Sequence, residues 1–282
     1  MQIADLRLPP KIRSLFSRLL AWVTPPKPEP KTILSPLTRD DVRDLHLSWE
    51  SRFTRQELWE HLDQHPGLAW RVPGTNDYAV GDLWQGRTEI GLVLEIMGSR
   101  RRALLLERLL QSMKEIGARL AILSQDEEER SLPFYQEHGW TSREEVILYR
   151  RPSGPIPVLT TRLTMLTLTP DRLPDLLALE EAAFPWLWRY GVPIFQAAAI
   201  TPNCRLSLGF LGNDLVGYLI YTLHGDFGHL DRLAVHPRCQ DQDYGAELLA
   251  YALRDMRARG ATSVGLSTQR DNHRSQRLYE GF

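Results

Sequence analysis

The sequence predicts an α/β protein built from two tandem copies of one mixed-sheet domain. Strand-like and helix-like segments alternate along the chain, and a segment rich in proline and glycine divides it near the middle. The sequence also resembles itself at an offset of 143 residues, the separation of Ala103 and Ala246. A length of 282 residues suits two domains of ~100–200 residues each.

Composition excludes several classes of protein. Hydrophobic residues make up 43% and charged residues 24% of the chain, and the net charge of -1 implies no general attraction to nucleic acid or acidic lipid. The two cysteines, Cys204 and Cys239, lie in no CxxC or Cys/His cluster, so they indicate no disulfide framework and no zinc site. No apolar run reaches the ~18 residues of a membrane span. We therefore expect a cytoplasmic protein without a metal.

Residues 1–30 are predicted to hold an amphipathic helix and a proline-rich linker. Apolar residues between 9 and 23 recur at helical spacing, and residues 24–30 contain four prolines. The helix has basic residues beside its apolar stripe, so it could lie on a membrane surface. It could equally pack on its own protein or on a partner subunit, because any packed helix shows such a stripe.

The internal repeat follows structure rather than composition. The matching residues fall at helical spacing, continue through a glycine that ends each helix, and then enter a strand. They pair Ala103 with Ala246, Leu105 with Leu248, Leu106 with Leu249, Leu110 with Leu253, Met113 with Met256, Gly117 with Gly260, Ala118 with Ala261, Leu123 with Leu266 and Ser124 with Ser267. We expect domains at 31–150 and 158–282, joined by a linker that begins at Arg150.

Each element of the second copy can be justified by its local pattern. Alternating or β-branched segments predict strands and apolar residues at helical spacing predict helices, while Gly212-Asn213-Asp214 predicts a hairpin turn. The predicted strands are 161–167, 205–210, 215–223, 227–235 and 263–267, and the predicted helices are 171–183, 193–200, 246–259 and 272–280. The order β-α-α-β-β-β-α-β-α predicts a mixed sheet with helices on both faces.

Two segments of this copy resemble the signature motifs of the GNAT N-acetyltransferase superfamily. The first is the run Leu-Asp-Arg-Leu-Ala-Val-His-Pro-Arg-Cys-Gln at 230–240, followed by a loop and a helix. The second comprises Asn272, Ser275 and Leu278-Tyr279-Glu280. The resemblance covers residues 158–282 and implies two tandem GNAT domains, the first of them degenerate.

The resemblance implies a site for acetyl-CoA as acyl donor. The strand would bind the pantetheine arm through unpaired backbone groups, and the loop and following helix would bind the pyrophosphate. Tyr279 would donate a proton to the leaving thiolate. The implied cofactor-binding residues are Leu233, Ala234, Val235, Gln240, Asp241, Gln242, Asp243, Tyr244, Gly245, Ala246, Asn272 and Ser275.

The phosphate loop departs from the family pattern. Asp243 replaces a usual glycine, and Asp241 adds a second carboxylate that would repel pyrophosphate. Asp243 also suits the N-cap of the next helix, where it would consume N–H groups that phosphate needs. The loop is therefore either a tuned, weak CoA site or a former site closed by its own cap.

The chain end is a second departure. In the family pattern three residues follow the tyrosine, and Gly-Phe and further strands come after them. The sequence stops at Gly281-Phe282, before it reaches that point. We expect a truncated second domain, in which either another chain supplies the missing strands or the domain is impaired. In the first copy the corresponding strand is predicted at 145–149.

The first copy lacks a convincing cofactor loop. At the 143 offset, Ile90-Gly91-Leu92 matches the cofactor strand and 97–102 matches the phosphate loop, with Arg102 in place of Gly245. Its arginines could attract phosphate or simply start a solvated helix. We expect a degenerate domain that shapes the acceptor cleft of the second, and assign Tyr135 no catalytic role.

Removal of the amine proton needs a base, and His229 or Asp231, on one side of their strand, could serve. An ordinary surface ion pair explains them equally well. The aromatic segment 184–190 could recognise an acceptor or plug the core.

The predicted function is transfer of an acetyl or short acyl group to a primary amine of a small molecule or protein N-terminus. The alternative is an inactive module that binds a partner or senses acyl-CoA; oligomeric state stays open.

Overall fold

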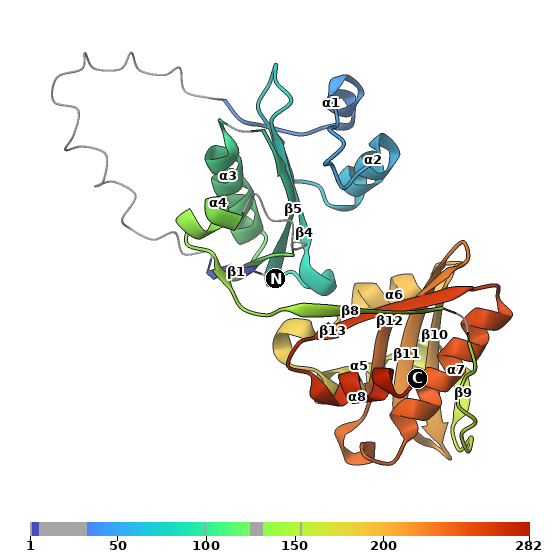
Figure 1. Cartoon of the computed structure of the whole chain (residues 1–282). Helices are drawn as coiled ribbons and strands as arrows, with labels where there is room; N and C mark the ends of the chain where they lie inside the picture. The colour runs from blue at the N-terminus through green and yellow to red at the C-terminus, as the bar shows by residue number, and fades with distance from the viewer. Residues whose placement is uncertain (1, 6–32, 99, 125–131, 153) are drawn as a thin grey trace, which may run out of the picture. The chain divides into compact units, whose positions relative to one another are not determined.

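The computed structural model describes residues 2–5, 33–98, 100–124, 132–152 and 154–282. The chain forms two compact units, residues 1–143 and 144–282. Each unit has its own sheet, with helices on both faces and a hydrophobic core on each side (Figure 1).

The second unit contains a six-stranded mixed sheet in the order β8-β13-β12-β11-β10-β9. Neighbouring strands are antiparallel except β12 and β13, which are parallel. The strands span Val146–Pro152 (β8), Thr164–Thr167 (β9), Cys204–Leu211 (β10), Asp214–His224 (β11), Phe227–Val235 (β12) and Ser263–Gln269 (β13). The predicted hairpin turn joins β10 to β11, and Gly212 there has a φ of 61° that glycine adopts without strain.

Helices cover both faces of this sheet. The apolar side chains of α5 (Leu173–Ala183) and α6 (Val192–Ile200) form one core, and those of α7 (Tyr244–Ala258) with α8 (His273–Glu280) form the other. The close approach of α7 needs a glycine, because a Cβ on Gly228 of β12 would come within 2.5 Å of the Met256 sulfur. The predicted β-α-α-β-β-β-α-β-α order is confirmed for residues 158–282, and β8 precedes it in this unit.

β12 and β13 separate part-way along their length. They pair only from Phe227 to Leu230 on β12, although β12 continues to Val235. Over the same stretch β11 pairs with β12 and β8 pairs with β13, so each strand keeps its outer neighbour. The described structure thus leaves an open wedge between the two strands beyond Leu230.

The strand predicted for the first copy at 145–149 belongs to the second unit. β8 pairs antiparallel with β13 from Val146 to Pro152, so the domain boundary lies at 143/144 and not at 150. β8 therefore covers the outer edge of β13. Alternation predicts a strand correctly, but the partner of a strand depends on residues far away in sequence.

The first unit repeats the arrangement. Its sheet has the order β2-β3-β4-β5-β6-β1-β7, with β5 and β6 parallel. The strands are Gln2–Asp5 (β1), Ser35–Pro36 (β2), Ala69–Arg71 (β3), Tyr78–Leu83 (β4), Ile90–Met97 (β5), Leu120–Leu123 (β6) and Thr141–Ser142 (β7). The helices are Arg39–Asp44 (α1), Arg55–Gln64 (α2), Arg102–Glu115 (α3) and Leu132–Glu137 (α4). β1 lies beside β6, in the position that β8 takes beside β13.

The offset of 143 holds for helix and final strand but fails for the cofactor strand. β5 pairs with β6 starting at Ile90, as β12 pairs with β13 starting at Phe227, so the two strands correspond at an offset of 137. Gly91 approaches Met113 just as Gly228 approaches Met256. The alignment of Ile90-Gly91-Leu92 with Leu233–Val235 was therefore wrong, because the loop from β5 to α3 (98–101) is shorter than that from β12 to α7 (236–243).

The predicted amphipathic helix at 9–23 and the proline-rich linker lie outside the described residues. Among the residues that are described, no helix combines the length and apolarity needed to span a bilayer. Cys204 and Cys239 are both free thiols in the structure.

Candidate functional site

A pocket of about 520 Å³ opens at the wedge between β12 and β13. All of its lining residues belong to the second unit. They come from the residue Glu144 before β8, the end of α5 and the aromatic loop after it, the end of β12, the loop into α7 with its first turn, and the end of β13 with α8. Among the predicted cofactor residues the lining includes Leu233, Ala234, Val235, Gln240, Asp241, Asp243, Tyr244, Gly245, Ala246, Asn272 and Ser275. Gln242 is not among the lining residues.

The end of β12 forms one wall of the pocket. Leu233–Val235 pair with β11 on one side, and no strand of the described structure pairs with their other edge. The Gln240 side chain donates to the carbonyl of Val235 at 3.1 Å and so ties the loop back to the strand. An open strand edge lined with N–H and C=O groups can bind an extended amide-containing chain as an added strand.

The loop into α7 is shaped by two residues with left-handed backbone. Asp241 has a φ of 60° and Asp243 a φ of 64°, a region that favours glycine. Asp243 stands where the GNAT pattern that the sequence resembles usually has glycine, and its backbone lies in the region that glycine adopts most readily. The Asp241 carboxylate is neutralised in part by Arg274 of α8, whose guanidinium lies 3.2 Å from it.

The expectation that Asp243 caps α7 was wrong. Asp243 occupies the N-cap position, but its side chain makes no capping hydrogen bond. The left-handed backbone differs from the extended conformation in which a cap side chain reaches back to the first turn. The helix start therefore keeps N–H groups and its positive end for an anion.

Gly245 supplies an opening at this helix start. Its φ lies outside the left-handed region, and a Cβ there would meet only Leu278 at 3.4 Å and Val235 at 3.8 Å, which are ordinary contacts. Neither backbone conformation nor packing thus requires glycine. A larger side chain at 245 would project among the pocket residues, so the glycine keeps the cradle open for a ligand.

The second predicted motif lies on α8. Asn272 caps this helix, since its Oδ1 accepts from the backbone N–H of Ser275 at 3.2 Å. Its amide nitrogen remains a donor for a ligand in the pocket. Tyr279 is mostly buried beside Tyr149 of β8, with ring centroids 5.9 Å apart, and does not line the pocket itself.

Tyr279 is connected to the pocket through Ser275, which lines it and hydrogen-bonds to the tyrosine. Burial raises the pKa of Tyr279 above its usual value of 10.0, and the Ser275 hydrogen bond and the Arg232 charge oppose the shift. The hydroxyl is therefore protonated at neutral pH and can donate a proton.

His229 and Asp231 meet, as their spacing on one strand predicts. The His229 Nδ1 lies 2.7 Å from the Asp231 carboxylate, which also accepts from the Thr222 hydroxyl at 2.7 Å. Asp231 is the extra residue of a bulge in β12, between the pairs formed by Arg232 and Leu230. Neither residue lines the pocket; they lie on β12 just before the segment that does.

The aromatic loop is held in place by a buried ion pair. Arg232 of β12 pairs with Glu180 of α5, both almost fully buried. The guanidinium also donates to the Trp188 carbonyl at 2.6 Å and stacks 3.4 Å from the centroid of Phe184. Because Phe184 and Trp188 line the pocket, these contacts fix the aromatic loop in position as one wall of the pocket.

Sequence reasoning missed four polar lining residues, which are Glu144, Gln269, Asp271 and Arg274. Arg274 contacts Gln240 and Asp241, while Glu144 accepts from the Trp188 indole N–H at 2.7 Å. Arg274 could have been predicted from the sequence, because it lies one turn before Leu278 on α8, the helix that contains the second motif. Glu144 carried none, since it lies in the segment that was assigned to the other domain. Asp271 also lines the pocket.

Residues 173–282 match the family described as the acetyltransferase (GNAT) family. This segment is a GNAT-family domain. The match supports acyl transfer in general terms. No curated protein sequence matches the chain.

Solved structures extend the fold comparison over both units. A GCN5-related N-acetyltransferase from Sphaerobacter thermophilus is similar over 89% of this chain and 91% of its own, with a TM-score of 0.60 and 16% identity. A GCN5-related N-acetyltransferase from Kribbella flavida is similar over 85% of this chain and 64% of its own, with a TM-score of 0.60 and 13% identity. At these identities the likeness shows the fold, which is that of two tandem GNAT-like domains.

Proposed function

We propose that the second unit is an N-acetyltransferase domain that takes acetyl-CoA, or another short acyl-CoA, as donor and a primary amine as acceptor. The observation that carries this proposal is the continuity of one pocket. The open edge of β12 at Leu233–Val235, the uncapped start of α7 and the Asn272–Ser275 turn of α8 all line it.

Each of these parts suits one portion of the donor. The open strand edge offers backbone groups to the two amides of pantetheine, and the helix start offers N–H groups to the pyrophosphate. Gly245 leaves space at the point where strand and helix meet. Arg274 and the Asn272 amide add donors on the opposite wall.

The reaction requires one bond to form and one to break. The amine nitrogen attacks the thioester carbonyl carbon, the C–N bond forms and the C–S bond breaks. We assign the proton for the leaving sulfur to the Tyr279 hydroxyl, delivered directly or through Ser275. The acceptor's proton passes to a base, for which His229 with Asp231 remains our candidate, through water because neither lines the pocket.

The charge of the pocket supports an amine as acceptor. Its lining contains four carboxylates, of Glu144, Asp241, Asp243 and Asp271, against one guanidinium, that of Arg274. Such a field attracts an ammonium group. Glu144 lies beside the aromatic loop, where it could orient the acceptor next to Trp188.

The same carboxylates favour the second candidate, an inactive module, because they oppose pyrophosphate. Arg274 offsets only part of this repulsion, as its contact with Asp241 is exposed. We further infer that the first unit is a degenerate copy. Its loop is short, and the Arg102 guanidinium there lies over the Phe134 ring at 4.6 Å.

A transfer assay tests the proposed function. The full chain is incubated with acetyl-CoA and a panel of primary amines, and the free thiol released is measured. We expect turnover with at least one amine, reduced by about a hundredfold in Tyr279→Phe, the scale of a lost general acid. A Tyr251→Phe variant serves as the matched control, because Tyr251 lies in the middle of α7 and does not line the pocket. Undiminished turnover in Tyr279→Phe would remove the acid role; turnover with no amine would favour the inactive module.

A further inference from the structure

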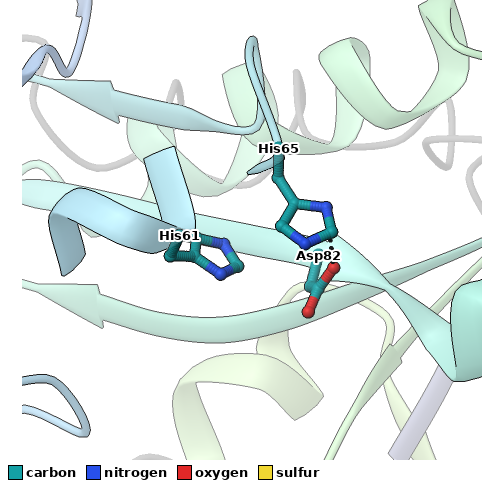
Figure 2. A group of neighbouring side chains, drawn as sticks. All are labelled: His61, His65 and Asp82. Carbon is teal, nitrogen blue, oxygen red and sulfur yellow. Dashed lines mark ion pairs between the residues drawn. The ribbon is translucent and has the colours of Figure 1, made fainter. Parts of the chain in front are cut away.

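A histidine pair and a carboxylate meet in the first unit, away from the acyl-donor pocket. His61 lies in the last turn of α2 and His65 ends that helix, so the two are one turn apart on the same side. Asp82 comes from β4, and Figure 2 shows the three side chains converging. All three are only partly exposed.

The three side chains are close enough to share one ion. Each offers one ligand atom, and these atoms lie within 4.8 Å of one another. His65 Nδ1 is 3.1 Å from Asp82 Oδ1. No other group of three such side chains occurs in the part of the chain that the structure describes. A tetrahedral zinc ion with bonds of ~2.0–2.2 Å would draw the three atoms slightly closer together.

The surroundings orient the ligands. His61 Nε2 lies 2.8 Å from the carbonyl of Gly81, and since a carbonyl only accepts, this nitrogen carries the proton in the neutral ring. The lone pair is then on Nδ1. The Asp82 carboxylate accepts from the Leu83 backbone N–H at 2.6 Å. Fixing a histidine by its second N–H and a carboxylate by a donor is characteristic of metal ligands.

An ordinary ion pair does not account for the whole arrangement. An ion pair explains the contact between His65 and Asp82. It does not explain why the His61 ring stacks on the His65 ring, with centroids 4.7 Å apart. Two imidazoles beside one carboxylate are a donor set that zinc prefers.

We propose that His61, His65 and Asp82 form a binding site for a divalent transition-metal ion of the zinc type. Three protein ligands leave a tetrahedral ion one further position for water. The ion would join the end of α2 to β4, next to the register shift against β5 between Val80 and Gly81. It would thus stabilise the first unit and take no part in acyl transfer.

The site escapes a search that starts from cysteines. Metal was not expected because Cys204 and Cys239 lie in no cluster, yet His-x-x-x-His on a helix already places two imidazoles on one face. The third ligand comes from a different element. Only the packing of α2 against the sheet brings it close.

The test uses the full chain after removal of metals with a chelator. Zn²⁺ is titrated by calorimetry, and Co²⁺ is added in parallel because its visible absorption reports tetrahedral coordination by nitrogen and oxygen. The variants are His61→Ala and Asp82→Asn, and His46→Ala is the matched control, as His46 is exposed in the same unit. Circular dichroism checks that each variant is folded.

We expect about one Zn²⁺ per wild-type chain, a higher melting temperature with the ion, and at least about tenfold weaker binding in both variants but not in the control. Unchanged binding in folded His61→Ala and Asp82→Asn, or no binding by wild type, would overturn the proposal. If one of the two variants does not fold, the test rests on the other: loss of its Co²⁺ absorption spectrum supports the proposal, and an unchanged spectrum overturns it. Acetyl-CoA binding is independent of these results.

Discussion

At the scale of single residues, Asp243 is the side chain that most strongly opposes binding of the donor at the proposed site. It combines a left-handed backbone with a carboxylate inside the pocket. A non-glycine residue in this conformation costs on the order of 1 kcal/mol, and the charge opposes an anionic ligand. Since the side chain does not cap α7, nothing in the described structure depends on the carboxylate.

Two substitutions separate these effects. Asp243→Asn removes the charge but keeps a residue that tolerates left-handed backbone, whereas Asp243→Gly removes both charge and strain. We expect both variants to bind acetyl-CoA more tightly than wild type, and only Asp243→Gly to gain about 1 kcal/mol in free energy of unfolding. Calorimetry and urea denaturation measure the two quantities. Weaker binding in both would mean that the carboxylate contacts the donor favourably.

Tyr279 allows a prediction about pH. Burial raises its pKa above 10.0, so the protonated form that donates persists to higher pH than for an exposed tyrosine. The fraction of Tyr279 able to donate is therefore full at neutral pH and falls only above pH 10. We expect no alkaline loss of kcat attributable to Tyr279 below about pH 10. A kcat profile with a fall near pH 9 that disappears in Tyr279→Phe would contradict the assignment.

At the scale of elements, β8 completes the second unit. It pairs with β13 over its whole length, and Tyr149 contacts both Tyr279 and Glu280 of α8, the latter by a hydrogen bond of 3.1 Å. The strand thus supports the helix that carries the proposed acid. Without β8 the edge of β13 would present unpaired N–H and C=O groups.

Two fragments test this role. Residues 144–282 retain β8 and residues 154–282 lack it, while both contain the pocket segments from α5 onward. We expect the longer fragment to unfold cooperatively and the shorter one to lose several hydrogen bonds, each contributing ~0.5–1.5 kcal/mol, and to aggregate. Equal midpoints in urea for the two fragments would show that β8 is dispensable.

The sequence predicted elements better than it predicted their partners. The strands and helices of the second unit follow from local periodicity. The assignment of Leu233–Val235 and Gly245 to one site came instead from the resemblance to the GNAT motifs. The register of β5 and the sheet that β8 joins could not be predicted, because both depend on loop length and on distant pairing. The backbone conformation of Asp243 was also not predicted. An aspartate before a helix suggests an N-cap, but the backbone at this position is left-handed.

At the scale of the whole molecule, the two units share a fold but differ at the donor site. Both have a strand that continues past its parallel partner. In the first unit the next loop is short, a Cβ on Gly98 would come within 2.3 Å of Asp77, and Arg102 covers the Phe134 ring. In the second unit the corresponding space is a pocket. From this difference we expect one donor site per chain.

The most direct measurement is a calorimetric titration of acetyl-CoA into the full chain, beside the variants Gly245→Leu and Gly281→Leu. The account predicts about one site per wild-type chain, loss of binding in Gly245→Leu because the side chain enters the pocket, and unchanged binding in Gly281→Leu, whose glycine lies outside it. Absence of binding by wild type, binding that survives in Gly245→Leu, or two equal sites would contradict a single donor site at the wedge between β12 and β13.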